Sequence, residues 1–348
     1  MKGVSAVSNP QNDNKAEVQA KIMRFLVDKR KAIEQFGKYS YEVLSIHQEY
    51  AKYLAENRPE TQELALRDLK DIYDHLEGEN SRNSLQTSLS LIQFFFNSND
   101  LISAKDWAER SLNISEVSLG KTDPLTIAIM EWYITVLFEM EEDDKAISLD
   151  NDFIQRVSEC YGAGSFESFL ARRNHGEMLT VSDKWEEARE TFLALEHAEE
   201  SIGYTDEMLQ LYIFRCATQL NLYSEQHQAA EKHISNLETL GAEKIDLANA
   251  YSSLLDGFYS TKQYESALGC AKKLIPLLQG MGNEGRRSLA SVLQTAALIC
   301  CKTGADKDAV KYAEKALATA KKCYKYDYKN LSEFQNAYDL VLNTVKNK

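Results

Sequence analysis

The sequence predicts an all-α protein, an α–α superhelix of about seven helical hairpins, and three observations support this fold class. Its 348 residues include only 4 Pro and 15 Gly, a composition that favours long helices joined by short turns. One alanine and one glycine each recur with a period of about 42 residues. Between these markers, apolar residues follow helical spacing.

The recurring alanine opens the second helix of each predicted hairpin. It stands at Ala65, Ala104, Ala146, Ala188, Ala229, Ala267 and Ala309. The recurring glycine follows 12 to 16 residues later, where a left-handed residue would end that helix, at Gly78, Gly120, Gly162, Gly203, Gly241 and Gly282. A hairpin of this size cannot bury both apolar faces alone, so we expect the hairpins to stack into a solenoid.

The remaining elements follow from the same patterns. First helices of the hairpins are predicted over residues 126–140, 166–181, 246–259 and 287–301. Polar residues 1–13 are expected to be disordered, and residues 14–38 to form an amphipathic helix that caps the array. The array itself is expected over 40–325, and a lone helix over 330–346 should cap its other end.

The residues around the alanines resemble the tetratricopeptide repeat (TPR) family, which has a small residue and aromatic residues at fixed places before such an alanine. Here these places hold Gly176, Leu179 and Trp185 before Ala188, and Leu255, Phe258 and Tyr264 before Ala267. The longer period and the loop from Leu119 to Pro124 resemble the repeats of kinesin light chain, although Asp123 stands where that family has histidine. The resemblance implies a fold and a binding role, and it does not specify a ligand.

Charge and composition exclude several classes of partner. The net charge is −13, and residues 101–200 hold 9 Lys or Arg against 22 Asp or Glu. Nucleic acid is therefore not an expected partner, because phosphate binding needs a concentrated basic face. No apolar stretch approaches the length of a membrane span and no signal peptide is visible, so we expect no membrane partner and a cytoplasmic location.

The residue types that carry catalysis or bind metals do not form a motif. The six cysteines lack a C-x-x-C pair and read as buried, reduced thiols. The six histidines lack an H-E-x-x-H pair, so no metal site and no cofactor are expected. The one catalytic possibility, Cys216 beside His175 on adjacent first helices, depends on repeat stacking alone. We therefore do not expect an enzyme.

The TPR resemblance implies which side chains would line a concave groove, because family positions 2, 5, 6 and 9 of each first helix point into it. The candidate groove residues are Glu131, Thr135, Arg173, Asn174, Glu177, Phe214, Arg215, Thr218, Asn249, Ser252, Ser253, Asp256, Ser291, Gln294 and Thr295. Arg173 and Arg215 could hold a ligand carboxylate, or they could neutralise acidic neighbours such as Glu177.

Two functions fit this surface. The first is a scaffold or adaptor that binds a peptide or protein segment in the groove. The second is a regulator whose superhelix changes shape when a peptide or small ligand binds, with the N-terminal helix as a moving part instead of a cap. Neither the partner nor the oligomeric state follows from the sequence.

Overall fold

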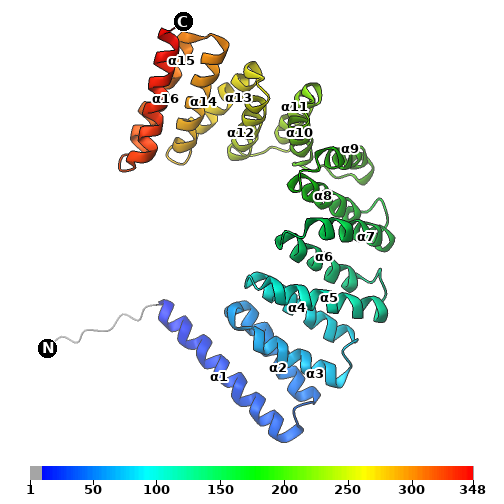
Figure 1. Cartoon of the computed structure of the whole chain (residues 1–348). Helices are drawn as coiled ribbons and strands as arrows, with labels where there is room; N and C mark the ends of the chain where they lie inside the picture. The colour runs from blue at the N-terminus through cyan, green and yellow to red at the C-terminus, as the bar shows by residue number, and fades with distance from the viewer. Residues whose placement is uncertain (1–9, 348) are drawn as a thin grey trace, which may run out of the picture. The chain divides into compact units, whose positions relative to one another are not determined.

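The computed structural model describes residues 10–347, which form sixteen α-helices, one short 3-10 helix and no strand (Figure 1). The chain divides into two compact units, one up to Ala171 and one from Arg172. The boundary lies inside helix α8 (Phe166–Val181). Fourteen helices pair into seven successive hairpins, which confirms the predicted all-α repeat architecture.

The first unit contains α1 and three complete hairpins. Its helices are α1 (Pro10–Phe36), the hairpin α2 (Tyr41–Asn57) and α3 (Glu63–Leu76) with the 3-10 helix Pro59–Thr61 between them, α4 (Arg82–Asn97) with α5 (Leu101–Ser118), and α6 (Pro124–Glu139) with α7 (Asp143–Tyr161). Because α1 begins at Pro10, residues 10–13 are helical and the prediction of disorder was wrong there. Residues 1–9 lie outside the described residues.

The second unit continues the same pattern and ends in a lone helix. Its hairpins are α8 with α9 (Trp185–Ile202), α10 (Leu209–Gln219) with α11 (Tyr223–Thr239), α12 (Lys244–Ser260) with α13 (Tyr264–Gly280), and α14 (Arg286–Thr303) with α15 (Asp306–Cys323), followed by α16 (Tyr328–Lys346). Within each unit the first helices of successive hairpins lie side by side, and the second helices form the other layer (Figure 1).

The recurring alanines are all buried. Each of the seven is at most 3% exposed, and a methyl side chain allows close backbone approach without a loss of helix propensity. The recurring glycines all have positive φ, between 62° and 100°. Gly203, for example, ends α9 in the left-handed region, and its N–H donates to Glu199 O, a conformation that costs other residues about 1–2 kcal/mol.

The turn inside each hairpin supplies a second, more regular marker. One residue with φ between 57° and 77° lies in six of these turns, at Asn99, Glu141, Asp183, Asn221, Lys262 and Gly304. The residue five positions later begins the buried contact of the second helix, and it is Ala104, Ala146, Ala188, Gln226, Ala267 and Ala309. The predicted marker Ala229 is therefore wrong by almost one helical turn, and Gln226 occupies the repeat position.

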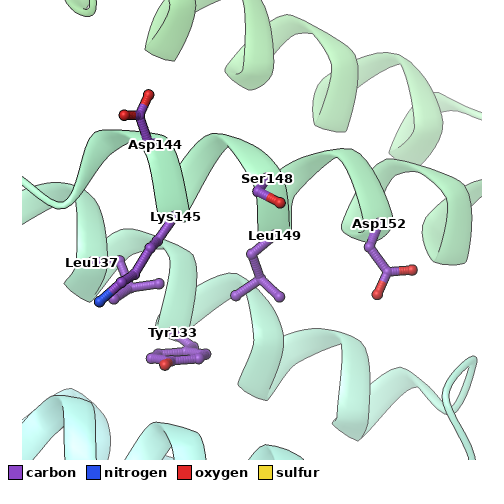
Figure 2. Close-up of a pocket in the computed structure, with 7 residues that line it drawn as sticks. All are labelled: Tyr133, Leu137, Asp144, Lys145, Ser148, Leu149 and Asp152. Atoms are coloured by element: carbon purple, nitrogen blue, oxygen red, sulfur yellow. The ribbon is translucent and has the colours of Figure 1, made fainter.

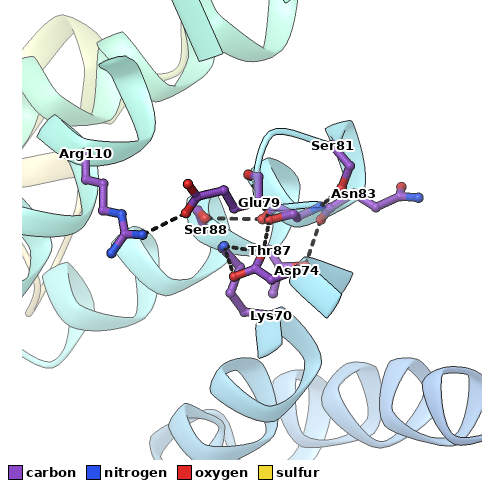
Figure 3. A network of polar contacts seen from close by, with 9 residues as sticks. Lys70, Asp74, Glu79, Ser81, Asn83, Thr87, Ser88 and Arg110 are labelled. Carbon is purple, nitrogen blue, oxygen red and sulfur yellow. Dashed lines mark hydrogen bonds and ion pairs between the residues drawn. The ribbon is translucent and has the colours of Figure 1, made fainter. Parts of the chain in front are cut away.

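Polar side chains hold successive hairpins together at their loops. In the loop between α3 and α4, Ser81 caps α4 by accepting from the Ser84 N–H, and Asp74 of α3 accepts from both Lys70 Nζ, at 2.6 Å, and the Ser84 hydroxyl of α4 (Figure 3). Glu79 in the same loop pairs with Arg110 of α5 at 2.8 Å. The loop is thus tied both to the hairpin before it and to the one after it.

At the other end of the chain, α16 covers the last hairpin. Phe334 and Val341 of α16 are 8% and 1% exposed and pack against α14 and α15. Full burial of such side chains stabilises the fold by roughly 1.5–3 kcal/mol each. The helix begins at Tyr328, two residues before the expected boundary.

Candidate functional site

The first-helix layer carries the predicted groove residues, and the first unit contributes two of them. Glu131 and Thr135 of α6 are both exposed, and the Thr135 hydroxyl donates to Glu131 O at 2.9 Å. Partial desolvation raises the pKa of Glu131, and the nearby Asp150 carboxylate raises it further. This part of the surface therefore favours a neutral or cationic group over an anion.

In the second unit, Arg173 of α8 is already occupied by partners from its own chain. Its Nε lies 2.6 Å from Asp206 Oδ2 and its Nη1 lies 3.2 Å from Glu177 Oε1. The guanidinium also lies over the Tyr212 ring, 5.5 Å from its centroid. Of the two roles considered for Arg173, these contacts favour neutralisation of acidic neighbours.

The buried polar group around Arg173 has a structural cause. Asp206, in the loop between α9 and α10, is 4% exposed and accepts from the Met208 N–H at 2.8 Å. Tyr212 stacks on Phe192 with a centroid distance of 4.9 Å, and burial followed by the hydrogen bond to Glu177 raises its pKa to about 12. These contacts fix α8 to the start of α10, while Asn174 of α8 stays exposed.

The groove residues predicted on α10 were assigned by counting back from Ala229. Because the repeat position is Gln226, their assignment shifts by three residues. Phe214 is 1% exposed and packs edge-on against Phe258 at 5.3 Å, so its prediction as a groove residue was wrong. It occupies the core position held by Gly176 and Leu255 in neighbouring hairpins. Thr218 turns toward the interior and accepts from the Gln226 amide at 2.8 Å.

Arg215 remains a surface cation after this correction. It is exposed and forms no ion pair with any residue that the structure describes. It stands six residues before the turn residue Asn221, as Asp256 stands six before Lys262. The two side chains thus hold equivalent places on the adjacent helices α10 and α12.

The last two first helices contribute polar, mainly exposed side chains. Asn249, Ser253 and Asp256 of α12 and Ser291 of α14 are exposed, and partial desolvation raises the pKa of Asp256. The other predicted members, Ser252, Gln294 and Thr295, are half-buried. Gln294 lines a small cavity that α16 closes, so it faces that helix.

A hollow that the sequence did not indicate lies between α6 and α7 in the first unit. It has a volume of about 530 Å³ and is lined by Tyr133 and Leu137 of α6 and by Lys145, Leu149 and Asp152 of α7, among others (Figure 2). Lys145 pairs with Glu142 at 2.6 Å, as does Lys105 from α5. To predict this hollow from the sequence, one would need the repeat register and the faces on which α6 and α7 pack together.

Cys216, the cysteine considered as a catalytic residue, lies in the core. Cys216 is fully buried, and burial raises the pKa of its thiol to about 12, so it is not a nucleophile near neutral pH. Among residues 10–347 with described side chains, no group of three or more potential ligands could hold a metal ion. No described helix is both long enough and apolar enough to cross a membrane.

Comparison with known proteins identifies the fold. No family model and no curated protein sequence matches the chain. Among solved structures, BtubC (BKLC) from P. vanneervenii matches with TM-score 0.53 and 10% identity over 66% of this chain and 93% of that one. A tetratricopeptide repeat protein from Parabacteroides merdae matches with TM-score 0.50 and 13% identity over 85% and 98%. Aspartyl phosphate phosphatase F from Bacillus subtilis matches with TM-score 0.50 and 10% identity over 83% and 73%. The chain thus has the TPR-type fold that the sequence predicted.

Proposed function

We propose that this protein is an interaction scaffold that binds an extended segment of a partner protein along the first-helix layer of its second unit. The observation that carries the proposal is the row of exposed polar side chains on α10 and α12, which includes Arg215, Asn249, Ser253 and Asp256. Amide and hydroxyl groups can bond peptide backbone without requiring a sequence. Arg215 would bind an anionic group of the partner segment, and Asp256 would bind a cationic one.

The repeat architecture supports this proposal. Within each unit, short connections place the first helices of successive hairpins side by side, and this layer is long enough for an extended segment (Figure 1). Surfaces of this kind bind by many small contacts along a segment.

The test is affinity capture with a triple variant. Arg215→Ala, Asn249→Ala and Asp256→Ala all change exposed side chains, so thermal stability should stay within about 1 kcal/mol of the unaltered protein. A matched control carries Lys272→Ala and Lys311→Ala on the second-helix layer. The proposal requires a partner that the unaltered protein and the control retain and the triple variant loses; identical partners for all three would refute it.

A specific observation also favours the regulatory alternative. Helix α1 packs against α2, yet Met23, Leu26 and Val27 are 53%, 41% and 47% exposed, and Ala32 is the one buried residue among its described side chains. A helix held this lightly opens at low free-energy cost. Deletion of residues 1–37 separates the roles: a large loss of stability identifies a cap, and unchanged stability with altered partner binding identifies a moving element.

A further inference from the structure

The second-helix layer of the second unit contains a groove that is distinct from the surface proposed above. It runs between α11 and α13, has α12 as its floor, and has a volume of about 350 Å³. Tyr251, Leu254 and Phe258 form the apolar floor, while Glu231 and Glu238 stand on the α11 side. Both glutamates are exposed, and neither forms an ion pair with any described residue.

In the first unit, α5 and α7 hold the places that α11 and α13 hold in the second. Counted from the turn residues Asn99 and Asn221, Glu116 of α5 and Glu238 of α11 both lie seventeen positions on. Between α5 and α7, Glu116 is paired with Arg156 of α7 at 2.6 Å. Arg156 is 5% exposed, and its guanidinium is held between Glu116 and Asp152 of its own helix, which also lies 2.6 Å away.

The α11–α13 groove lacks this internal cation. Arg156 lies fifteen residues after Glu141, and the residue fifteen after Lys262 is Leu277. Lys273 of α13 forms no ion pair with either Glu231 or Glu238 in the described structure. The arginine that pairs with Glu116 in the first unit is therefore replaced by an apolar residue at the same repeat position, and Glu238 has no ion-pair partner among the described residues.

A second substitution removes positive charge from the other end of the same groove. Lys105 of α5 pairs with Glu142 at 2.6 Å. At the corresponding places on α11 and α13, His227 Nε2 lies 2.6 Å from Gln263 Oε1, and the His227 ring lies 4.8 Å from Phe258. An ion pair has become a contact with a neutral amide, so no lysine stands at this place beside the groove.

We propose that the groove between α11 and α13 binds an arginine side chain of a partner protein, with the guanidinium at Glu238 and Glu231 and the apolar stem on Tyr251, Leu254 and Phe258. Arg156 shows, between α5 and α7, that a guanidinium fits between two neighbouring second helices against a glutamate at the position of Glu238. The planar guanidinium can donate to two carboxylates at once. Its methylene stem matches an apolar floor.

The direct test is binding of a capped, fluorescently labelled Leu-Arg-Leu peptide to the full chain, followed by anisotropy. The control peptide replaces arginine with citrulline, which keeps the shape and removes the charge. The arginine peptide should bind saturably, and the citrulline peptide should bind at least about fivefold more weakly. Equal binding of the two peptides, or no saturable binding of the arginine peptide at millimolar concentration, would overturn the proposal.

Three variants locate the site. Glu238→Gln should weaken binding by about fivefold. Leu277→Arg should supply the cation from within the chain, as Arg156 does, and so abolish binding; unchanged affinity in this variant overturns the proposal. Arg156→Leu should expose Glu116 and raise the stoichiometry from one peptide to two. If Arg156→Leu unfolds the first unit, Glu238→Gln and Leu277→Arg still decide the outcome.

Discussion

Two glycines inside adjacent helices should respond in opposite directions to the same substitution. A Cβ built at Gly257 of α12 would lie 2.4 Å from Phe214 Cε1 and 3.3 Å from Thr218 Oγ1. A Cβ at Gly269 of α13 would have no heavy atom within 4 Å. Both residues are helical, so alanine improves helix propensity at both by about 1 kcal/mol.

The packing of Phe214 decides the sign at Gly257. The ring is 1% exposed and wedged against Phe258, so it cannot swing into solvent, and overpacking of this kind costs about 1–3 kcal/mol. The net effect of Gly257→Ala is therefore a loss of up to about 2 kcal/mol once the propensity gain is subtracted. Gly269→Ala should gain about 1 kcal/mol.

Urea unfolding followed by far-UV circular dichroism measures both effects. The midpoint should fall for Gly257→Ala and rise for Gly269→Ala, with an unchanged slope. Combining Gly257→Ala with Phe214→Leu should recover part of the loss, because the smaller side chain leaves room for the methyl group. A Gly257→Ala variant as stable as Gly269→Ala would show that the contact with Phe214 does not constrain this interface.

Three further outcomes are expected. Burial, and then the charge of Lys29, lowers the pKa of His47 to about 4. The contribution of neutral His47 to the free energy of unfolding is thus complete above pH 6.5, and up to about 3 kcal/mol of it is lost as the pH falls toward 4. The difference in unfolding free energy between the unaltered protein and His47→Gln, measured by urea titration, should shrink over that range. A constant difference would contradict this assignment. Cys216 should resist iodoacetamide near neutral pH until the protein is unfolded, as mass spectrometry would show, because its thiol is buried and protonated; rapid labelling of the folded protein would contradict this. Gly120→Ala should cost about 1–2 kcal/mol through its φ of 100°, and an unchanged thermal midpoint would show that the loop relaxes.

The repeat architecture was predictable because its markers are local. A buried alanine and a positive-φ glycine leave a trace in the sequence wherever two helices cross or a helix ends. The predicted repeat register was wrong in α11, where the alanine marker is absent. Gln226, a fully buried polar residue, stands at the alanine position, and the nearby Ala229 was taken for the marker. The same slip placed Phe214 on the surface.

The binding surface was less predictable because it depends on partners distant in sequence. Nothing near Arg173 in the sequence indicates that Asp206, from the loop after the next helix, would occupy it. Likewise, Glu116 and Glu238 hold equivalent positions in the repeat, and the sequence does not indicate that Arg156 forms an ion pair with Glu116 alone. Pairing between helices sets which charges are free, and single-helix patterns carry no information about it.

The hairpin turns also govern how the protein would respond to a stretching force. Five of the six marked turns place a non-glycine residue at φ near 60°, and for Glu141 and Lys262, which lack the local hydrogen bonds that asparagine and aspartate use there, this strain costs about 1–2 kcal/mol. Each strained turn lies within one hairpin, and the main contacts among the described helices are within a hairpin or between neighbouring hairpins. Extension from the ends should therefore release hairpins one at a time, in steps of about 40 residues.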